Sequence, residues 1–223
     1  LHLTGLPQLG LQADLLIGAG CVASLETAAV SLGDQGIAPA FERARRAGTV
    51  RIVESTCPAI HAGLTAAEKG VSHLPLAGVI GSDLVRLRPD WRIIDYPYAE
   101  GRTLLVPAIR PDTLLCHAAL ADRSGNLWIG VRRELMLAAH AARRTVATVE
   151  EIVDRDLLAE DVWAAGCVPS LYIDATALAP NGAAPVGLRG RYAADRAALR
   201  AYAEAARTPA GFARFLDAWL ADA

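Results

Sequence analysis

The sequence contains few of the residues that build metal or redox centres. Its 223 residues include four cysteines and five histidines. No two cysteines form a C-x-x-C pair, and no two histidines have the H-x-x-x-H or H-E-x-x-H spacing that puts both on one helical face. No metal is therefore implied, and we expect the cysteines to be free thiols that fill space in the core.

An excess of one charge and long apolar runs are also absent. The chain has 22 Lys and Arg residues against 24 Asp and Glu, a net charge of −2, which offers no basic face to a nucleic acid. No apolar run approaches the roughly 20 residues that span a bilayer, and the amino end has no basic-then-apolar signal pattern. We therefore expect a cytoplasmic protein that binds neither nucleic acid nor membranes.

The overall composition is that of a globular protein. With 53% hydrophobic and 21% charged residues, the chain is long enough for one well-buried core, and it has no repeat, linker or low-complexity tract. A single domain over residues 1–223 is expected. Because the chain begins at Leu1, and Leu1–Gly10 resembles the end of a strand, we also expect that an amino-terminal segment is missing.

Strand-like and helix-like patterns alternate along the chain. Strands are expected at Asp14–Ile17, Thr49–Glu54, Thr113–His117 and Thr145–Val149, and helices at Pro58–Gly70, Glu134–Arg144, Asp195–Ala206 and from Pro209 onward. Such alternation favours parallel strands joined by crossover helices. The sequence therefore predicts an α/β fold, an open, mostly parallel sheet with helices on both faces.

One of these strands leads into a sharply turning polar segment. Thr113–His117 is followed by Asp122–Asn126, in which Gly and Asn tolerate positive φ. Binding residues in open α/β sheets gather at strand ends. Gly125 and Asn126 are therefore candidate substrate-binding residues.

A glycine motif near the amino end allows two interpretations. Gly18-Ala-Gly20-Cys-Val-Ala23 matches the G-x-G-x-x-A pattern of dinucleotide-binding folds, with Glu54 as the ribose-binding carboxylate. However, Glu54 lies 34 residues after Gly20, where about 20 are expected, and Pro39 interrupts the intervening helix. The alternative, that the glycines allow a tight turn, is favoured.

Glu54-Ser-Thr-Cys-Pro58 places a carboxylate and two hydroxyls where a strand ends and a helix begins. Glu54 could act there as a base or a nucleophile if the site is partly shielded from water. The structural alternative is that Glu54 caps the following helix or pairs with an arginine. Spacing alone favours this alternative.

A second polar segment, Gly81-Ser82-Asp83, precedes arginines at positions 86, 88 and 92. Its backbone N–H groups and Ser82 could hold a carbonyl or a carboxylate, and the arginines could bind phosphate. The commoner outcome for such a segment is that Asp83 is an N-cap and the arginines form a solvated face.

Several segments, taken jointly and in order, carry a resemblance to a known family. They are Asp14–Gly20, Gly36–Phe41, Glu54-Ser55, Gly81–Leu84, Val106–Asp112, Ala121-Asp122 with Gly125-Asn126, Thr148–Val153, Gly182-Ala183, Arg191-Tyr192 and Asp195. With these segments the chain resembles, over nearly its whole length, the α-type subunits of family I coenzyme A transferases, which include glutaconate CoA-transferase.

The resemblance implies that CoA moves from an acyl-CoA to a free carboxylic acid in an α2β2 complex with a homologous β-type partner. CoA is then a substrate, and no tightly bound cofactor is expected. In such enzymes the attacking glutamate lies on the β-type partner in a Ser-Glu-Asn-Gly motif, which this chain lacks. This chain would supply the acid-binding half of the crevice and oxyanion donors. Glu54 is the catalytic candidate, and the substrate-binding candidates are Ser55, Gly81, Ser82, Asp83, Gly125 and Asn126.

The chain departs from the family pattern at several polar positions. Ala119 and Leu120 stand where relatives often have His-Arg, and Asn181 and Ala184 where histidines are common. Loss of polar partners disfavours a short dicarboxylate and suits a bulkier, more apolar acyl group. Two other functions stay open: a CoA-ester or ring-opening hydrolase that uses Glu54 as its base, and a nucleotide-binding module that uses the glycine motif.

Overall fold

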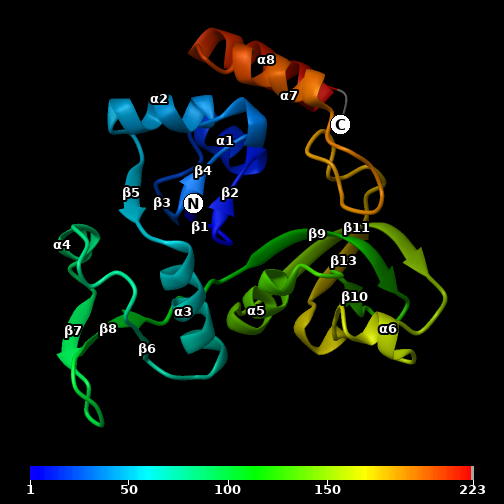
Figure 1. Ribbon diagram of the computed structural model, residues 1–223. Helices are drawn as coiled ribbons and strands as arrows, with labels where there is room; N and C mark the ends of the chain where they lie inside the picture. The colour runs from blue at the N-terminus through cyan, green and yellow to red at the C-terminus, as the bar shows by residue number, and fades with distance from the viewer. Residues whose placement is uncertain (222–223) are drawn as a thin grey trace.

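The computed structural model describes residues 1–221, and its strands form four sheets (Figure 1). The amino-terminal part contains a parallel sheet in the order β1-β3-β5 and a parallel pair, β2-β4. Their bounds are β1 His2–Thr4, β2 Gln8–Leu9, β3 Ser24–Thr27, β4 Ala29–Val30 and β5 Arg51–Glu54. Two crossover helices, α1 (Leu11–Gly18) and α2 (Pro39–Ala47), join these strands.

The two carboxyl-terminal helices pack on this amino-terminal unit. α7 (Arg196–Ala205) and α8 (Pro209–Ala221) contribute Tyr202 and Phe212 to a buried cluster that includes Leu25 of β3. Asp14, which is fully buried, accepts hydrogen bonds from Tyr202 Oη (2.7 Å) and from the backbone N–H of Phe41 (2.6 Å) at the start of α2. The Asp14 carboxylate thus links α1, near the amino end of the chain, to α7, near its carboxyl end.

The predicted strand at Asp14–Ile17 is wrong, because these residues belong to helix α1. A short apolar run bounded by glycine fits a buried helix as well as a strand, and periodicity cannot separate the two. The prediction that Pro39 interrupts a helix is also wrong: Pro39 begins α2, where its missing N–H costs no hydrogen bond.

A second unit combines α3 with an antiparallel sheet in the order β6-β8-β7. Its elements are α3 Cys57–Glu68, β6 His73–Leu76, the short helix α4 Leu84–Leu87, β7 Arg92–Asp95 and β8 Arg102–Pro107. Ala59 of α3 packs against Leu104 and Val106 of β8 and against Trp91. The predicted helix at Pro58–Gly70 is confirmed, and Gly70 adopts the left-handed φ of +69° directly after it.

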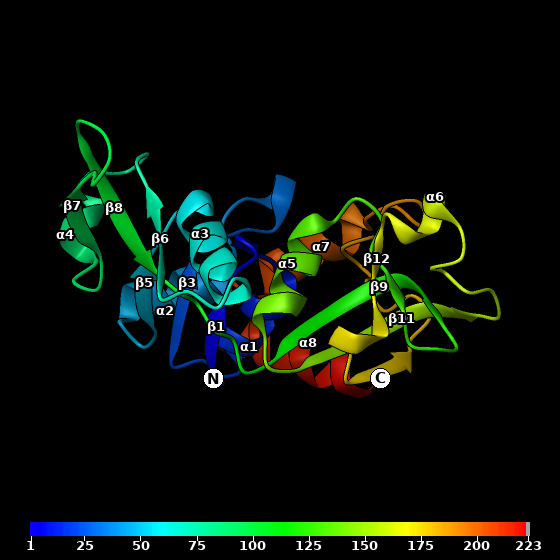
Figure 2. The ribbon, with the colours of Figure 1, turned by 90° about the horizontal axis from the view of Figure 1, so that it is seen from below.

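The third unit is a five-stranded sheet in the order β12-β10-β9-β11-β13. Its strands are β9 Leu114–Asp122, β10 Leu127–Trp128, β11 Thr145–Val153, β12 Cys167–Val168 and β13 Ala175–Leu178, with α5 at Arg133–Ala141 and α6 at Asp161–Ala164. β9, β11 and β13 are parallel, and α5 packs its alanines against β9 and β11. Figure 2 shows this sheet and the β6-β8-β7 sheet at opposite ends of the molecule.

The predicted α/β class is confirmed, with the parallel strands divided between separate sheets. Both carboxyl-terminal helices begin at a side-chain cap: the Asp195 carboxylate accepts from Ala198 N (2.9 Å), and the Thr208 hydroxyl accepts from Gly211 N (3.1 Å). The core location predicted for the cysteines is wrong for Cys21 and Cys57, which are exposed. Across residues 1–221, none of the helices combines the length and the apolar content that a membrane span requires.

Candidate active site

Glu54 ends β5 and lies beside the carboxyl end of β3. The two strands are parallel, and Glu54 is in register with Thr27. In α/β sheets, ligands bind at the carboxyl ends of parallel strands. The Glu54 side chain is exposed, and within residues 1–221 its carboxylate accepts no hydrogen bond and forms no ion pair. The carboxylate is therefore free to meet a ligand.

Arg88, from the connection after α4, closes this end of the two strands. Its guanidinium donates to the Glu54 carbonyl oxygen (3.0 Å), to Glu26 Oε1 (2.7 Å), and through two N–H groups to Asp90 (2.9 and 2.8 Å). The Arg88 side chain is only 6% exposed and lies over the ring of Trp91. The second unit of the fold therefore holds the backbone of Glu54 in place.

The charges around Arg88 support each other. Burial opposes the charged guanidinium, but hydrogen bonds and attraction from Asp90 and Glu26 outweigh it and raise the pKa of Arg88 above its ordinary value. Arg88 in turn lowers the pKa of Asp90. The predicted solvated arginine face is thus wrong for Arg88, which is an internal ion-pair partner.

Neither structural alternative for the Glu54 side chain is realised. Thr56, not Glu54, caps α3, and its hydroxyl accepts from Ala59 N (3.3 Å). The contact with Arg88 uses the Glu54 carbonyl, and the carboxylate stays unpaired among residues 1–221. Next to it, Ser55 is 8% exposed, and its hydroxyl has no hydrogen-bond partner in the described part of the chain. Six other buried side-chain polar atoms of residues 1–221, three of them threonine hydroxyls, also lack a partner, so this feature is not specific to the surroundings of Glu54.

The turn at Gly81-Ser82-Asp83 precedes α4 and is exposed. Ser82 Oγ donates to the Val79 carbonyl (2.8 Å), and Asp83 pairs with Arg86 (3.0 Å) at the surface. Asp83 occupies the N-cap position of α4, but its side chain forms no capping bond. Because Arg88 ties α4 to Glu54, this turn lies on the Glu54 side of the molecule (Figure 1).

Gly125 and Asn126 lie elsewhere, in the turn between β9 and β10. The predicted turn is confirmed: Gly125 has φ +85°, and Asp122 accepts from the backbone N–H of Asn126 (2.9 Å). The Asn126 side chain, in a residue that is 4% exposed, donates to Asp122 (2.8 Å) and accepts from Ser170 N (2.9 Å). Figures 1 and 2 place this turn and β5 on different sides of the molecule, so Glu54 and Asn126 are not brought together.

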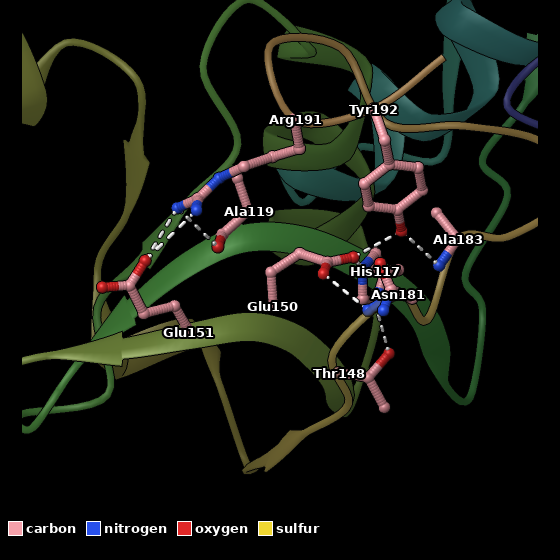
Figure 3. Close-up of polar contacts among 9 residues, drawn as sticks. All are labelled: His117, Ala119, Thr148, Glu150, Glu151, Asn181, Ala183, Arg191 and Tyr192. Atoms are coloured by element: carbon pink, nitrogen blue, oxygen red, sulfur yellow. Dashed lines mark hydrogen bonds and ion pairs between the residues drawn. The ribbon is translucent and has the colours of Figure 1, made fainter. Parts of the chain in front are cut away.

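The sequence did not predict a second polar cluster, which Figure 3 shows on β9 and β11. The Glu150 carboxylate is contacted by His117 Nε2 (2.7 Å), Tyr192 Oη (2.5 Å) and Asn181 N (2.7 Å). His117 Nδ1 is 2.8 Å from the Thr148 hydroxyl, and Tyr192 Oη accepts from Ala183 N (2.9 Å). Only the pairing of β9 with β11 puts His117 opposite Thr148, and the sequence does not reveal that pairing.

The Glu150 cluster holds the segment between β13 and α7. Burial alone would raise the pKa of Glu150, but the donors Tyr192, Asn181 N and His117 outweigh burial and lower it. Burial and the Glu150 carboxylate raise the pKa of Tyr192. Gly182 lies directly on the His117 ring, where a Cβ would come within 2.7 Å of Cε1. All three donors to Glu150 are used inside the fold.

The glycine motif is not a phosphate-binding turn. Gly18 ends helix α1 and packs so closely that a Cβ there would come within 2.4 Å of the Phe212 ring. A helix carboxyl end presents carbonyl groups, which repel phosphate. The nucleotide-binding hypothesis therefore loses its structural basis.

Similarity to known proteins shows which family the chain is part of. The A component of a 3-oxoadipate CoA-transferase from Pseudomonas knackmussii is 34% identical over 218 residues, which cover 93% of this chain and 74% of that protein. The chain belongs to the family of CoA-transferase α-type subunits. An uncharacterized protein from Archaeoglobus fulgidus is 31% identical, and the match covers 93% of this chain but 46% of that protein. No protein-family model matches the chain.

Other relatives in this family carry other activities. A cholesterol ring-cleaving hydrolase IpdA subunit from Rhodococcus jostii is 31% identical, with 97% of this chain and 75% of that protein covered. The solved structure of glutaconate CoA-transferase from Acidaminococcus fermentans matches with a TM-score of 0.88 at 27% identity, over 96% of this chain and 73% of that chain. The decarboxylase AibA/AibB matches with a TM-score of 0.83 at 33% identity, over 96% and 81%. The fold and the family are thus shared by several reactions.

Proposed function

We propose that this chain is the α-type half of a two-subunit enzyme that moves CoA from an acyl-CoA to a carboxylic acid. The observation that carries the proposal is the match along most of the chain to the corresponding components of 3-oxoadipate and glutaconate CoA-transferases. We further propose an α2β2 assembly with a homologous β-type partner. In this assembly the nucleophilic glutamate belongs to the partner, since no Ser-Glu-Asn-Gly motif occurs here.

We place the acid-binding half of a crevice shared with the partner on this chain. A carboxylate nucleophile adds to the thioester carbonyl, which puts negative charge on the acyl oxygen. The C–S bond then breaks, so that CoA thiolate leaves and an acyl–glutamyl anhydride remains. The thiolate attacks the glutamyl carbonyl of this anhydride, which releases the free acid and leaves CoA on the glutamate. Donors preorganised at the acyl oxygen lower the barrier. Glu54, Ser55 and the turn 81–83 are the groups on this side of the molecule that a bound acyl-CoA would meet. Arg88 would act indirectly, by holding the Glu54 backbone.

One observation favours a second function, hydrolysis of a CoA ester or of a ring carbon–carbon bond. The exposed Glu54 carboxylate has no partner within residues 1–221 and is available as a general base toward water. Relatives named cholesterol ring-cleaving hydrolase share 31% and 32% identity with this chain. In this alternative the essential catalytic carboxylate, Glu54, is on this chain and not on its partner.

The two functions differ in where the covalent adduct forms and in what Glu54→Gln does. The chain is co-purified with its β-type partner and given acyl-CoA with and without a carboxylic acid acceptor.

Transfer predicts ping-pong kinetics and a glutamyl-CoA adduct, found by mass spectrometry, on the partner alone. It also predicts that Glu54→Gln still forms this adduct. Hydrolysis predicts free CoA without an acceptor and loss of turnover in Glu54→Gln. If this chain alone, as a monomer, turned over acyl-CoA as fast as the complex does, its crevice would not be shared with a partner. Both proposed functions would then be wrong in this respect.

A further inference from the structure

The sheet of the second unit has one face that α3 covers and one face that is open. Leu104 and Val106 of β8 pack against α3. Because side chains alternate along a strand, Leu105 lies on the opposite face. A groove of about 330 Å³ is hollowed in that face, and its apolar lining includes Leu105 and Ile94 of the neighbouring strand β7. This face of the sheet therefore presents an apolar surface to the outside of the chain.

β7, the outer strand of this sheet, is exposed along its whole length. Among the described strands it pairs only with β8, and all four of its residues are exposed. Ile93 and Ile94 lie on opposite faces of the strand, so exposed apolar side chains occur on both sides. Figure 2 shows the β7-β8 pair projecting from one end of the molecule. Proteins usually cover or charge such an edge, so adjacent exposed isoleucines on it indicate a surface for a partner.

Two tyrosines stand where β7 turns back into β8. Tyr96 and Tyr98 border the groove, and Tyr98 is 98% exposed. A tyrosine side chain buries about 150–250 Å² when it is covered, and tyrosine is enriched among the interface residues that contribute most to binding. Tyr98 is therefore the residue of this surface that gains most from a partner.

The charges beside the groove indicate what kind of partner fits. Four charged residues of β7, β8 and their connecting turn, two of each sign, are exposed: Arg92, Asp95, Glu100 and Arg102. Within residues 1–221 none of the four forms an ion pair. A membrane surface or a nucleic acid would require an excess of Lys and Arg. An apolar centre with a polar rim of both signs is typical of an interface with another protein.

We propose that β7, the turn 96–101 and the groove form the docking surface for the β-type partner. The inference rests on the proposed function, in which the partner brings its glutamate to the crevice beside Glu54. Arg88 links the surface to that crevice, because its guanidinium donates to the Glu54 carbonyl (3.0 Å) and β7 begins shortly after it, at Arg92. A partner seated on β7 is therefore held on the Glu54 side of the molecule.

Other exposed apolar residues lie with the five-stranded sheet, at the opposite end of the molecule (Figure 2). Leu115 on β9 is 72% exposed, and Leu171, between β12 and β13, is 85% exposed. A partner bound only there would be far from Glu54. These two residues therefore supply matched controls.

The test measures how tightly the full chain holds the β-type partner. The co-purified complex is diluted stepwise, and its dissociation is followed by mass photometry. Loss of a dominant interface residue raises Kd by about 30-fold or more, and we expect this for Tyr98→Ala. Leu171→Ala should leave Kd within about twofold. Both residues are exposed, so neither variant should change the unfolding midpoint of the chain.

A charge placed in the groove gives a second, independent pair of variants. Ile94→Asp puts a carboxylate without a partner into the proposed interface and should prevent assembly at concentrations where wild type is fully assembled. Leu115→Asp changes another exposed strand residue, at the other end of the molecule, and should assemble as wild type does. If Leu115→Asp dissociates the complex and Ile94→Asp does not, the partner docks on the five-stranded sheet and the proposal is wrong.

Activity of the same complexes separates this inference from the proposed function. If wild type assembles but transfers no CoA, and Tyr98→Ala still weakens assembly, the docking surface stands and the proposed function fails. If the complex transfers CoA while Tyr98→Ala and Ile94→Asp assemble as wild type, the surface is wrong and the function stands. If this chain alone forms dimers that Tyr98→Ala dissociates, and the complex with the partner is unaffected, the surface binds a second copy and the proposal is overturned.

Discussion

Two glutamates, each on a strand of a parallel pair, differ in almost every physical respect. Glu54 ends β5, is exposed, and has a carboxylate without a partner among the described residues. Glu150 lies within β11, has a side chain that is 8% exposed, and takes hydrogen bonds from His117, Tyr192 and Asn181 N. A carboxylate that is saturated with donors serves the fold, whereas one that is left free can serve a ligand.

The surroundings of the two carboxylates show the same contrast between a group that stabilises the fold and a group that is free for a ligand. Near Glu150, Gly182 lies against the His117 ring in a space that a Cβ would not fit. Near Glu54, the backbone is held by Arg88 while the Ser55 hydroxyl stays unsatisfied. A preorganised site needs groups that are fixed in place before the ligand binds, and Arg88 fixes the backbone at Glu54. The difference between the two regions can be tested by substitution, from the largest expected effect to the smallest.

The largest effect is expected for Glu150→Ala. It removes the acceptor of two partly buried donors, His117 and Tyr192, and of the exposed Asn181 N–H. Hydrogen bonds to a charged group contribute about 1.5–3 kcal/mol each, so the free energy of unfolding should fall by about 3 kcal/mol or more in urea denaturation. The control is Glu151→Ala, because Glu151 is 53% exposed and pairs with Arg191 at the surface. Its expected change is below about 1 kcal/mol. Equal losses in the two variants would mean that burial does not distinguish the glutamates.

The same contacts make stability depend on pH. The pKa of Glu150 is lowered in the folded protein from its ordinary value of 4.5. Its contribution to stability is therefore fully present above about pH 4.5 and is lost as the pH falls below that value through the folded-state pKa. Urea denaturation of wild type between pH 6 and pH 3 should show this loss, with a weaker pH dependence in Glu150→Gln. Parallel pH profiles for the two proteins would contradict the assignment.

Arg88→Met should have the next largest effect. It leaves Glu26, whose side chain is 19% exposed, without its cation, whereas Asp90 is 46% exposed and regains water. We expect a loss of about 2–3 kcal/mol in the free energy of unfolding. Arg88→Lys keeps the charge but not the two-pronged contact, and should lose less. If the loss for Arg88→Met stays below about 0.5 kcal/mol, the ion pairs are not what holds Glu54.

A smaller effect is expected for Tyr192→Phe. The substitution removes one hydrogen bond to the Glu150 carboxylate and the acceptor for Ala183 N, which together stabilise by about 1–2 kcal/mol. Because Tyr192 holds the segment after β13, trypsin should cleave at Arg189 and Arg191 faster in the variant. Unchanged cleavage would show that other contacts hold this segment.

The smallest effect on stability is expected for Glu54→Gln. The carboxylate has no partner among the described residues, so the free energy of unfolding should stay within about 0.5 kcal/mol of wild type. Activity of the complex is the sensitive measurement for this variant. A large loss of stability would place Glu54 in the same class as Glu150 and remove the contrast between the two regions.

Local chemistry made several elements predictable. Pro58 and Gly70 bound α3, Asp195 and Thr208 cap α7 and α8, and the Asp122–Asn126 turn needs the positive φ that Gly125 adopts. Where the local pattern was ambiguous, prediction failed: Leu11–Gly18 is a helix. Its buried Asp14 looked like part of a strand because its partners, Phe41 N and Tyr202, lie 27 and 188 residues further along the chain.

Some features of the candidate site could also be predicted from the sequence, and others could not. That Glu54 ends a strand directly before a helix is evident from Arg51-Ile-Val-Glu followed by Pro58. The role of Arg88 and the separation of Asn126 from Glu54 were not predictable, since they depend on how distant segments meet.

The sequence by itself determined the α/β class, the bounds of α3 and α7 to within two residues, the start of α8, the turn after β9 and the position of an acid at the end of a strand, because each follows from the conformational preferences of neighbouring residues. Only the tertiary structure decided which acid is free and which is satisfied. Glu54 and Glu150 are chemically identical, and the donors that distinguish them come from residues 31 to 42 positions away from Glu150 and from Arg88, 34 positions from Glu54. Hydrogen bonding over such separations depends on the packing of whole elements and not on local preference.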